Sequence, residues 1–477
     1  MSYHKLTEWM ATLLFLLLAA AGIYHFASFR SRFNIVYALP QEDARLFRTE
    51  ETTPIRIGEH FQRFAESVPL ENTGSWPGFR GANHDNIVSD SPPLQTNWGK
   101  QGPTVLWRQE LGEGYAAPVI AYGFVYILDY LEQEEADALR CFSLFDGHEI
   151  WRRSYRNSIR RNHGKSRTVS AVSEQTVVTI GPKGHVMATD AFSGDLLWSC
   201  DMLAEYQTEL PQWYAGQCPL IDQGAVILAP AGKEALLLAL ELRSGEVRWQ
   251  TPNLPGLKMS HSSIIPMTLQ GVPQYVYAGL GGLVGISLEG ELLWHAKDWR
   301  PPVWAPSPVQ LSSEQIFLTA GYGAGSALLQ VAYDEGCWVT TLKEQWKPSM
   351  GPASEQQTPI FYHGLLFTIQ PKDAGTLRAQ LVAADPLKMP EVLTGSGREE
   401  RFGLGPYLLA DQRFWVVDDQ GVLSVFELIG QEFRKLAAHR VLPGFDAWGP
   451  IAFADGRMIL RDATSMVCLD LREKTGK

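Results

Sequence analysis

The most concentrated group of reactive side chains in the sequence is a basic run from Trp151 to Arg167. It reads WRRSYRNSIRRNHGKSR and contains no acid, although 41 Lys and Arg against 52 Asp and Glu give the chain a net charge of −11. Guanidinium groups bind carboxylates and phosphates, and clustered cations attract anionic lipid headgroups. The run therefore predicts an exposed loop, with or without an anionic partner, that carries Arg152, Arg153, Arg156, Arg160, Arg161 and Lys165.

A second candidate site comes from residues just before eight similar segments, each a small residue followed by two apolar strands. The segments start at Ala117, Ser170, Cys218, Ser263, Ser307, Thr358, Gly405 and Gly449. Shortly before six of these starts stand a cation, an imidazole, two amides and two indoles, which suit a small polar ligand or a peptide. These predicted rim residues are Arg167, Gln217, His261, Trp304, Gln357 and Trp448. The alternative is that the two tryptophans pack between repeats and that His261 is a satisfied hydrogen-bonding residue.

The elements that must position both groups form a repeat. Tryptophans 107, 151, 198, 249 and 294 are about 45 to 50 residues apart, and a turn glycine precedes the last four, at positions 147, 194, 245 and 290. Repeats of this length with four short strands are typical of β-propeller blades, so we predict an all-β, eight-bladed β-propeller. The last repeat lacks a fourth strand, whereas TVLWRQEL, from Thr104, is a spare strand before the first. Pairing these two ends would close the ring.

An apolar run from Trp9 to Phe29 is about long enough to cross a membrane as a helix. We predict an N-terminal transmembrane anchor over residues 1–32, a linker with one helix near IGEHFQRFAESV over residues 33–75, and the propeller over residues 76–477. A cleaved signal peptide ending at Ala19–Ala21 is the alternative. Arg30 and Arg32 favour a cytoplasmic C-terminal part, which conflicts with export.

Two of the repeats, TDAFSGDLLW and ALELRSGEVRW, resemble the blade signature of the PQQ-like β-propeller family, A-x-D-x-x-[ST]-G-x-x-x-W. WPGFRGANHDN, at Trp76 to Asn86, is similar to the W-P-x-F-R-G-P-N-R-D-G segment that precedes such propellers, but Ala82, His84 and Asn86 depart from it. The resemblance covers about residues 76–472 and implies an eight-bladed ring on the extracytoplasmic side. The family includes quinone-dependent alcohol dehydrogenases and BamB-like scaffolds that assemble outer-membrane proteins, so it implies no single activity.

A quinoprotein dehydrogenase in this family is expected to carry a vicinal cysteine pair, a catalytic aspartate and calcium ligands. The five cysteines here, Cys141, Cys200, Cys218, Cys337 and Cys468, are all isolated, as are acids such as Asp222 and Asp446. Calcium requires several converging oxygen ligands. We therefore predict no catalytic or metal-binding residues, and no motif supports PQQ or calcium as a cofactor.

The favoured function is a binding or scaffold module, anchored by one membrane pass with its propeller in the periplasm and with a protein partner. The alternatives are a PQQ-type oxidoreductase with an atypical site, and binding of a small ligand or carbohydrate in the axial funnel, with Trp304 and Trp448 as stacking surfaces. The acidic net charge argues against a nucleic-acid partner.

Overall fold

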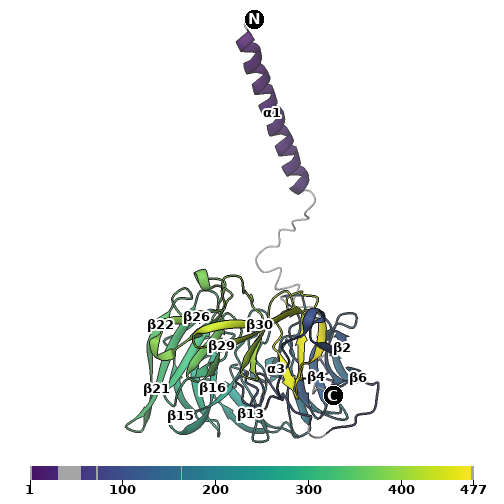
Figure 1. Ribbon diagram of the computed structural model, residues 1–477, viewed down its shortest axis with the longest axis vertical. Helices are drawn as coiled ribbons and strands as arrows, with labels where there is room; N and C mark the ends of the chain where they lie inside the picture. The colour runs from purple at the N-terminus through teal and green to yellow at the C-terminus, as the bar shows by residue number, and fades with distance from the viewer. Residues whose placement is uncertain (1–2, 31–54, 71–72, 163, 474–477) are drawn as a thin grey trace. The chain divides into compact units, whose positions relative to one another are not determined.

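The computed structural model describes residues 3–30, 55–70, 73–162 and 164–473 (Figure 1). The chain divides into two units, Met1–Pro54 and Ile55–Lys477. In the first unit, helix α1 spans Tyr3–Arg30. Among the described residues, no helix is both long enough and apolar enough to cross a membrane. The membrane anchor stays a prediction, and most of the predicted linker, residues 33–54 and 71–72, lies outside the described residues.

The second unit is an eight-bladed β-propeller, as predicted. From the inside outward, blade 1 contains β3 (Val119–Ala121), β4 (Phe124–Leu131), β5 (Ala136–Ser143), β6 (Glu149–Arg156) and β1 (His60–Arg63). Blade 2 contains β7 (Ala171–Ser173), β8 (Thr176–Ile180), β9 (His185–Asp190) and β10 (Leu196–Asp201). Blade 3 contains β11 (Leu220–Asp222), β12 (Ala225–Leu228), β13 (Leu237–Glu241) and β14 (Val247–Thr251). Blade 4 contains β15 (Ile265–Leu269), β16 (Val272–Gly279), β17 (Gly282–Ser287) and β18 (Leu292–Ala296).

The second half of the ring has the same order of strands. Blade 5 contains β19 (Val309–Gln310), β20 (Gln315–Ala320), β21 (Gly325–Asp334) and β22 (Cys337–Trp346). Blade 6 contains β23 (Ile360–Tyr362), β24 (Leu365–Ile369), β25 (Leu381–Ala384) and β26 (Val392–Gly395). Blade 7 contains β27 (Tyr407–Ala410), β28 (Arg413–Val417), β29 (Val422–Ile429) and β30 (Glu432–Arg440). Blade 8 contains β31 (Ala452–Ala454), β32 (Arg457–Arg461), β33 (Ser465–Asp470) and β2 (Thr104–Glu110). The short helices are α3 (Met202–Tyr206), η1 (Gly99–Gln101), η2 (Gly375–Leu377) and η3 (Pro386–Lys388).

The repeated tryptophan and glycine form the contact between neighbouring blades. A Cβ atom added to Gly194 of blade 2 would lie 2.8 Å from the indole of Trp151 in blade 1. The same contact joins Gly245 to Trp198 and Gly290 to Trp249, at 2.7 and 2.6 Å. Each of these glycines has a positive φ and presents a bare backbone to the flat indole face. The turn glycine therefore has two roles: its positive φ forms the turn within its own blade, and its lack of a side chain lets the tryptophan of the preceding blade pack against it.

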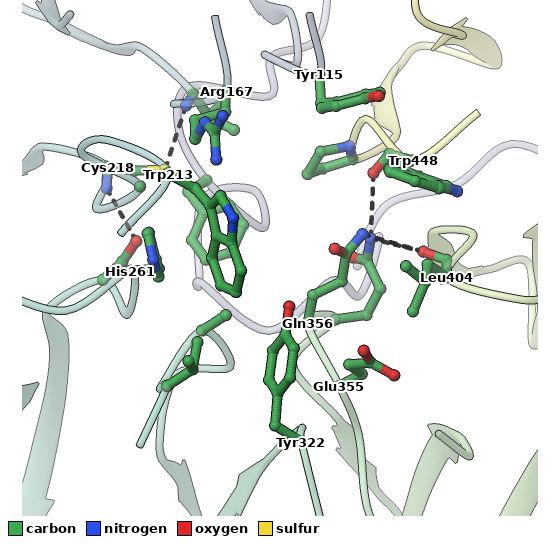
Figure 2. Close-up of a pocket in the computed structure, with 18 of the residues that line it drawn as sticks. Tyr115, Arg167, Trp213, Cys218, His261, Tyr322, Glu355, Gln356, Leu404 and Trp448 are labelled. Carbon is green, nitrogen blue, oxygen red and sulfur yellow. Dashed lines mark hydrogen bonds between the residues drawn. The ribbon is translucent and has the colours of Figure 1, made fainter. Parts of the chain in front are cut away.

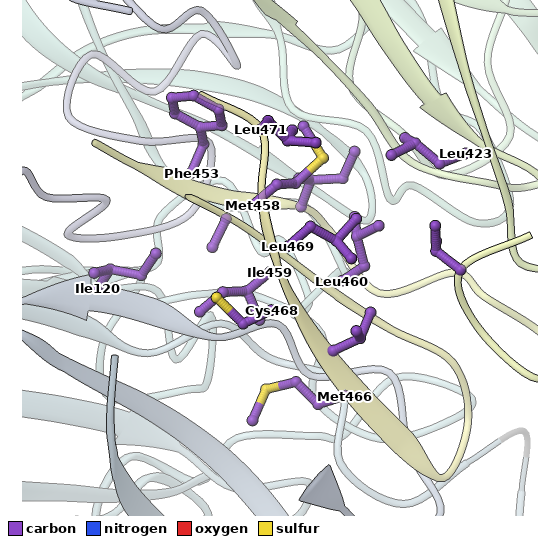
Figure 3. Close-up of a cluster of buried hydrophobic side chains, with 14 of the residues drawn as sticks. Ile120, Leu423, Phe453, Met458, Ile459, Leu460, Met466, Cys468, Leu469 and Leu471 are labelled. Atoms are coloured by element: carbon purple, nitrogen blue, oxygen red, sulfur yellow. The ribbon is translucent and has the colours of Figure 1, made fainter. Parts of the chain in front are cut away.

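The ring closes by pairing its two ends, as the spare strand predicted. Strand β2 pairs antiparallel with β33, for example Val105 with Leu469, and becomes the outer strand of blade 8. From β2, Trp107 packs against Gly147 of blade 1, as in the other blade contacts. The core of blade 8, built on Ile459 and Leu469, extends to Ile120 in blade 1 and Leu423 in blade 7 (Figure 3).

The segment before β2 belongs to the propeller. The helix predicted near IGEHFQRFAESV is wrong, because His60–Arg63 forms β1 and pairs with β6 on the outer edge of blade 1. Two phenylalanines of this segment, Phe61 and Phe64, lie under the guanidinium groups of Arg153 and Arg152. Phe61 and Phe64 are three residues apart, a spacing that also suits a helix, so the sequence pattern did not distinguish this edge strand from a helix.

The WPGFRG segment crosses the inner strands of several blades. Trp76 bridges to Ile120 in blade 1, and Asn86 donates through its side chain to the Tyr407 carbonyl in blade 7, at 3.3 Å. Between them, the buried Arg80 donates to the Pro359 carbonyl before blade 6, at 2.8 Å. Asn86 replaces a glycine of the family pattern at a φ of 62°, a conformation that asparagine tolerates. Asparagine is therefore compatible with the backbone conformation at this position.

Candidate functional site

One cavity of about 350 Å³ opens where the loops before the inner strands converge (Figure 2). Every blade contributes at least one residue to its wall, and the WPGFRG segment contributes Phe79. The side chains that matter below are Tyr115, Arg167, Trp213, His261, Tyr322, Glu355, Gln357, Lys372 and Trp448. The volume lies at the lower end of the range of small-molecule pockets.

A belt of hydrogen bonds between blades holds the wall of the cavity. The Cys218 thiol accepts from the Val169 amide at 3.2 Å, and the Cys218 amide donates to the Ser263 hydroxyl at 3.0 Å. Ser307 then donates to the Ser263 carbonyl at 3.2 Å, and its amide donates to the Thr358 hydroxyl at 2.9 Å. Cys218, Ser263, Ser307 and Thr358 are four of the eight starts of the repeated segments, so the small polar residue at these starts joins one blade to the next.

Two pairs of aromatic rings face the cavity (Figure 2). Trp213 stacks on Tyr322 with ring centroids 5.4 Å apart and also lies 6.0 Å from the His261 ring. From other blades, Tyr115 and Trp448 form a second pair at 4.9 Å. Flat aromatic faces supply a large contact area to a ligand while losing few side-chain rotamers. The cavity is therefore suited to a ligand with a flat or apolar part.

Partly buried polar contacts fix the second aromatic pair. The Trp448 indole donates to Asp419 at 2.7 Å, and the Tyr115 hydroxyl donates to Asp446 at 3.4 Å. Arg461, which is 1% exposed, donates to the Gly112 and Ala116 carbonyls on either side of Tyr115. Its burial lowers its pKa to about 10, so it remains a cation at neutral pH. Arg461 of blade 8 therefore holds the loop around Tyr115 in place in the absence of a ligand.

The cavity also presents charged groups of both signs. The guanidinium of Arg167 donates to the carbonyls of Asn162 and Gly164 at 2.9 and 2.8 Å. Burial lowers the pKa of Arg167 to about 10, so it stays charged at neutral pH. Beside it, burial and the charge of Arg167 lower the pKa of His261 to about 4, so the imidazole is neutral there. A carboxylate, Glu355, lines the other side of the cavity.

Four of the six predicted rim residues line this cavity: Arg167, His261, Gln357 and Trp448. Gln217 is fully buried instead and exchanges two hydrogen bonds with the backbone of Ala229, at 2.7 and 3.0 Å. Trp304 is 1% exposed and packs edge-on against Trp299, so it offers no stacking surface to a ligand. Its carbonyl accepts from the His261 amide at 3.0 Å and thereby positions that residue.

Sequence reasoning missed Trp213, Tyr322 and Glu355. Trp213 follows α3, which Asp201 caps by accepting from the amides of Leu203 and Ala204. Tyr322 lies in the turn between β20 and β21. The alignment of segment starts covered only the loops before the inner strands and so did not include this turn. Both residues have a positive φ, 71° and 56°, which is uncommon for a large side chain. The aromatic character of Trp213 and Tyr322 was the only feature of the sequence that indicated a role for them in ligand binding.

The basic run is only partly a loop. Its first part forms β6, where Arg152 pairs with Glu149 at 2.8 Å. Arg153 is 8% exposed and donates to the carbonyls of Gly58 and Gly194. The prediction of an exposed loop is therefore wrong for Arg152 and Arg153, which lie in β6 opposite β1, whereas Arg156 is exposed at the end of β6.

Acids from distant positions pair with most of the remaining cations of the run. Arg156 lies 3.6 Å from Glu135, Arg161 lies 2.8 Å from Glu113, and Lys165 contacts Glu132. Arg160 is exposed, and its carbonyl accepts from the Tyr214 hydroxyl. The local excess of positive charge is therefore largely balanced in the folded chain.

The lining of the cavity does not fit a calcium-bound quinone. No group of three or more His, Cys, Asp or Glu side chains within the described residues could hold a metal ion. Asp222 instead accepts from the Tyr275 hydroxyl at 2.8 Å, and Glu355 is the one carboxylate among the described cavity residues. Calcium takes six to eight oxygen ligands. All five cysteines are free, and Cys218 alone reaches the cavity.

Fold and cavity together define an eight-bladed propeller with an aromatic axial pocket. The chain belongs to the PQQ-like repeat family described as outer membrane protein assembly factor BamB, whose model matches residues 78–198 and 135–386. A comparison with curated proteins gives no match.

Several solved structures share the fold. The quinohemoprotein alcohol dehydrogenase ADHIIG from Pseudomonas putida HK5 is 12% identical with a TM-score of 0.56, over 84% of this chain and 81% of that one. A europium-containing methanol dehydrogenase is 9% identical with a TM-score of 0.57, over 82% and 89% of the two chains. The quinohemoprotein alcohol dehydrogenase from Comamonas testosteroni is 12% identical with a TM-score of 0.54, over 85% and 82%. At these identities the likeness extends to the fold alone.

Proposed function

We propose that this chain is a binding module and that the axial cavity is its ligand site. The observation that carries the proposal is the convergence of all eight blades on one cavity lined by five aromatic side chains, an arginine, a lysine and a glutamate. Convergent polar groups in an apolar pocket are the usual features of a ligand site. The hydrogen-bonded belt and the buried Arg461 hold the pocket in shape, which lowers the entropy lost on binding.

We also propose that the propeller is a scaffold anchored on the periplasmic side of a membrane. The apolar run from Trp9 to Phe29 supports the anchor, and the BamB description of the family supports a role in outer-membrane protein assembly. On this proposal the propeller also binds a protein partner. Protease added to intact spheroplasts should then digest the propeller, and a propeller protected until the inner membrane is opened would contradict this orientation.

The binding proposal is tested with the full chain in detergent. Dipeptides, monosaccharides, and PQQ with Ca²⁺ are titrated while the binding heat and the melting temperature are followed. A ligand at one hundred times its Kd should stabilise the native state by about 2.7 kcal/mol. Saturable binding without dye-coupled oxidation of alcohols supports the proposal, and oxidation that requires PQQ would replace it with an oxidoreductase.

Variants locate the bound probe. Trp213→Ala and Trp448→Ala each remove one aromatic wall and are expected to weaken binding at least tenfold. Trp338→Ala is the matched control, because Trp338 packs on Tyr333 in the β21–β22 hairpin, outside the cavity. Binding that is equally sensitive to all three changes, or to none, would contradict the axial site.

A further inference from the structure

The charged groups of the axial cavity lie on opposite sides of it. In Figure 2, Arg167 is above the Trp213 ring and Glu355 is below Gln356, with the open space between them. The third charged residue of the lining, Lys372, lies on the same side as Glu355, at 3.7 Å from its carboxylate. A cation on one side therefore faces an acid on the other, and the aromatic rings lie along the walls between them.

The Glu355 side already attracts an ammonium group. The Lys372 ammonium lies 5.7 Å from the centre of the Tyr322 ring as well as near Glu355. The Glu355 side chain is only 10% exposed, whereas that of Lys372 is 76% exposed. A covered carboxylate beside an aromatic face binds cations well, and an exposed lysine is held there weakly. Lys372 therefore occupies this corner as a replaceable internal cation.

The Arg167 side suits a carboxylate. The hydrogen bonds of Arg167 to Asn162 and Gly164 hold its guanidinium at the cavity wall. A planar guanidinium matches the two oxygens of a carboxylate. The neighbouring His261 is neutral above about pH 4, so Arg167 is the cation on this side at neutral pH. Its charge is partly desolvated, which strengthens its attraction for an anion.

We infer that the axial cavity binds a small zwitterion with a flat apolar group, such as a free aromatic amino acid or a short peptide with an aromatic side chain. The ligand carboxylate lies at Arg167, and the ligand ammonium displaces Lys372 at Glu355 and Tyr322. The apolar group lies against the aromatic rings, Trp213 among them. The inference rests on the proposed axial binding and specifies its ligand.

The size of the cavity limits the ligand. About 350 Å³ is near the lower limit for small-molecule pockets, so a few residues at most can enter. A neutral sugar would use the aromatic faces but would leave Arg167 and Glu355 without opposite charges from the ligand, at a cost in desolvation.

The first test needs no variant. Isothermal titration of the full chain in detergent compares L-phenylalanine and the dipeptide Phe-Phe with their N-acetylated and C-amidated forms. The unblocked forms should bind at least tenfold more tightly than either blocked form. The two parent probes distinguish a free amino acid from a peptide as the ligand. Equal affinity of blocked and unblocked forms overturns the inference.

Variants then assign each end of the ligand. Glu355→Gln should abolish the preference for a free amine, and Arg167→Gln should abolish the preference for a free carboxylate. Lys372→Gln removes the competing cation and should tighten binding of the unblocked probes severalfold. Lys258→Gln is the matched control, because Lys258 is 60% exposed and pairs with Glu209 at 2.6 Å outside the cavity. If Lys372→Gln binds the unblocked probes more weakly than Lys258→Gln does, Lys372 does not compete with the ligand ammonium at Glu355.

Failure of the inference and failure of the proposed function give different results. If monosaccharides bind and Trp213→Ala abolishes that binding, the axial site stands and the zwitterionic ligand is wrong. If neither Trp213→Ala nor Trp448→Ala changes the affinity for any probe, the proposed axial binding site itself is wrong.

Discussion

Replacing Asp137 with asparagine should stabilise the propeller at alkaline pH. Asp137 lies in β5 and is fully buried between blades 1 and 2. Its Oδ2 accepts from the Tyr155 hydroxyl at 3.0 Å and from the Asn157 amide at 2.7 Å. Its Oδ1 and the Asn157 Oδ1 have no hydrogen-bond donor within the described residues. A proton on the carboxyl, or the amide of an asparagine, supplies such a donor.

The magnitude follows from the pKa of Asp137. Burial raises this pKa from 3.8 to about 7, against the hydrogen bonds from Asn157 and Tyr155 and the charge of Lys183, which lower it. Between these two pH values the native state binds more protons than the unfolded state, so the free energy of unfolding falls as pH rises. The loss is complete above about pH 7. A shift of about three units corresponds to about 4 kcal/mol, of which about 3 kcal/mol develops between pH 5 and pH 8.

The comparison must be between the variant and the wild type. Burial lowers the pKa of His185 and of His261, and these groups change stability in the opposite sense over the acidic part of the range. The difference between Asp137→Asn and wild type cancels their contributions. For a unit of about 420 residues, 3 kcal/mol shifts the melting temperature by about 3 °C.

The assay is thermal unfolding of the full chain in detergent, followed by tryptophan fluorescence at several pH values. The gain in melting temperature of Asp137→Asn over wild type should be about 3 °C larger at pH 8 than at pH 5. Asp222→Asn is the control, because Asp222 also accepts from a tyrosine hydroxyl but is partly exposed. Parallel pH profiles of Asp137→Asn and wild type would refute the reasoning.

Two further predictions concern blade docking and the Tyr115 loop. Gly245→Ala should lower the free energy of unfolding by about 1–3 kcal/mol more than Gly271→Ala, because both glycines have a positive φ but only the Cβ at position 245 would meet an indole. Equal losses in denaturant titrations would contradict the role of the tryptophan. Arg461→Met should weaken binding of axial probes, because the carbonyls around Tyr115 lose their buried donor. Wild-type affinity in a folded Arg461→Met chain would show that the loop is held by other contacts.

The ring was predictable from the sequence because its blades repeat the same local chemistry. The inner strands begin one to three residues after the predicted segment starts, for example Val119 after Ala117 and Ala452 after Gly449. A small residue, an apolar strand and a glycine turn are local features of the sequence. Because they recur from blade to blade, the repeat can be recognised even where one copy matches the pattern poorly. Closure was predictable because the repeats begin with a spare strand and end with a blade that lacks one, and pairing the two satisfies both open sheet edges.

The binding site was less predictable because side-chain direction and long-range pairing are not local. Trp304 and Trp448 lie five and four residues before their inner strands, yet Trp304 packs against Trp299 and Trp448 faces the cavity. The basic run looked uncompensated because Glu113 and Glu132, which pair with it, come from a different part of the chain. Such pairings depend on how blades are arranged in space, and a window of sequence does not contain that information.

The pairing of β2 with β33 has a consequence for biosynthesis. Val105 and Leu469 are about 360 residues apart, so at 5–20 residues per second the ribosome needs about 20–70 s to deliver the partner of β2 after β2 itself has emerged. During that time a strand with unsatisfied amides is available to any other strand in its surroundings. A nascent chain arrested just before Ser465 should therefore associate with holdase chaperones, and release of the last strand should end that association.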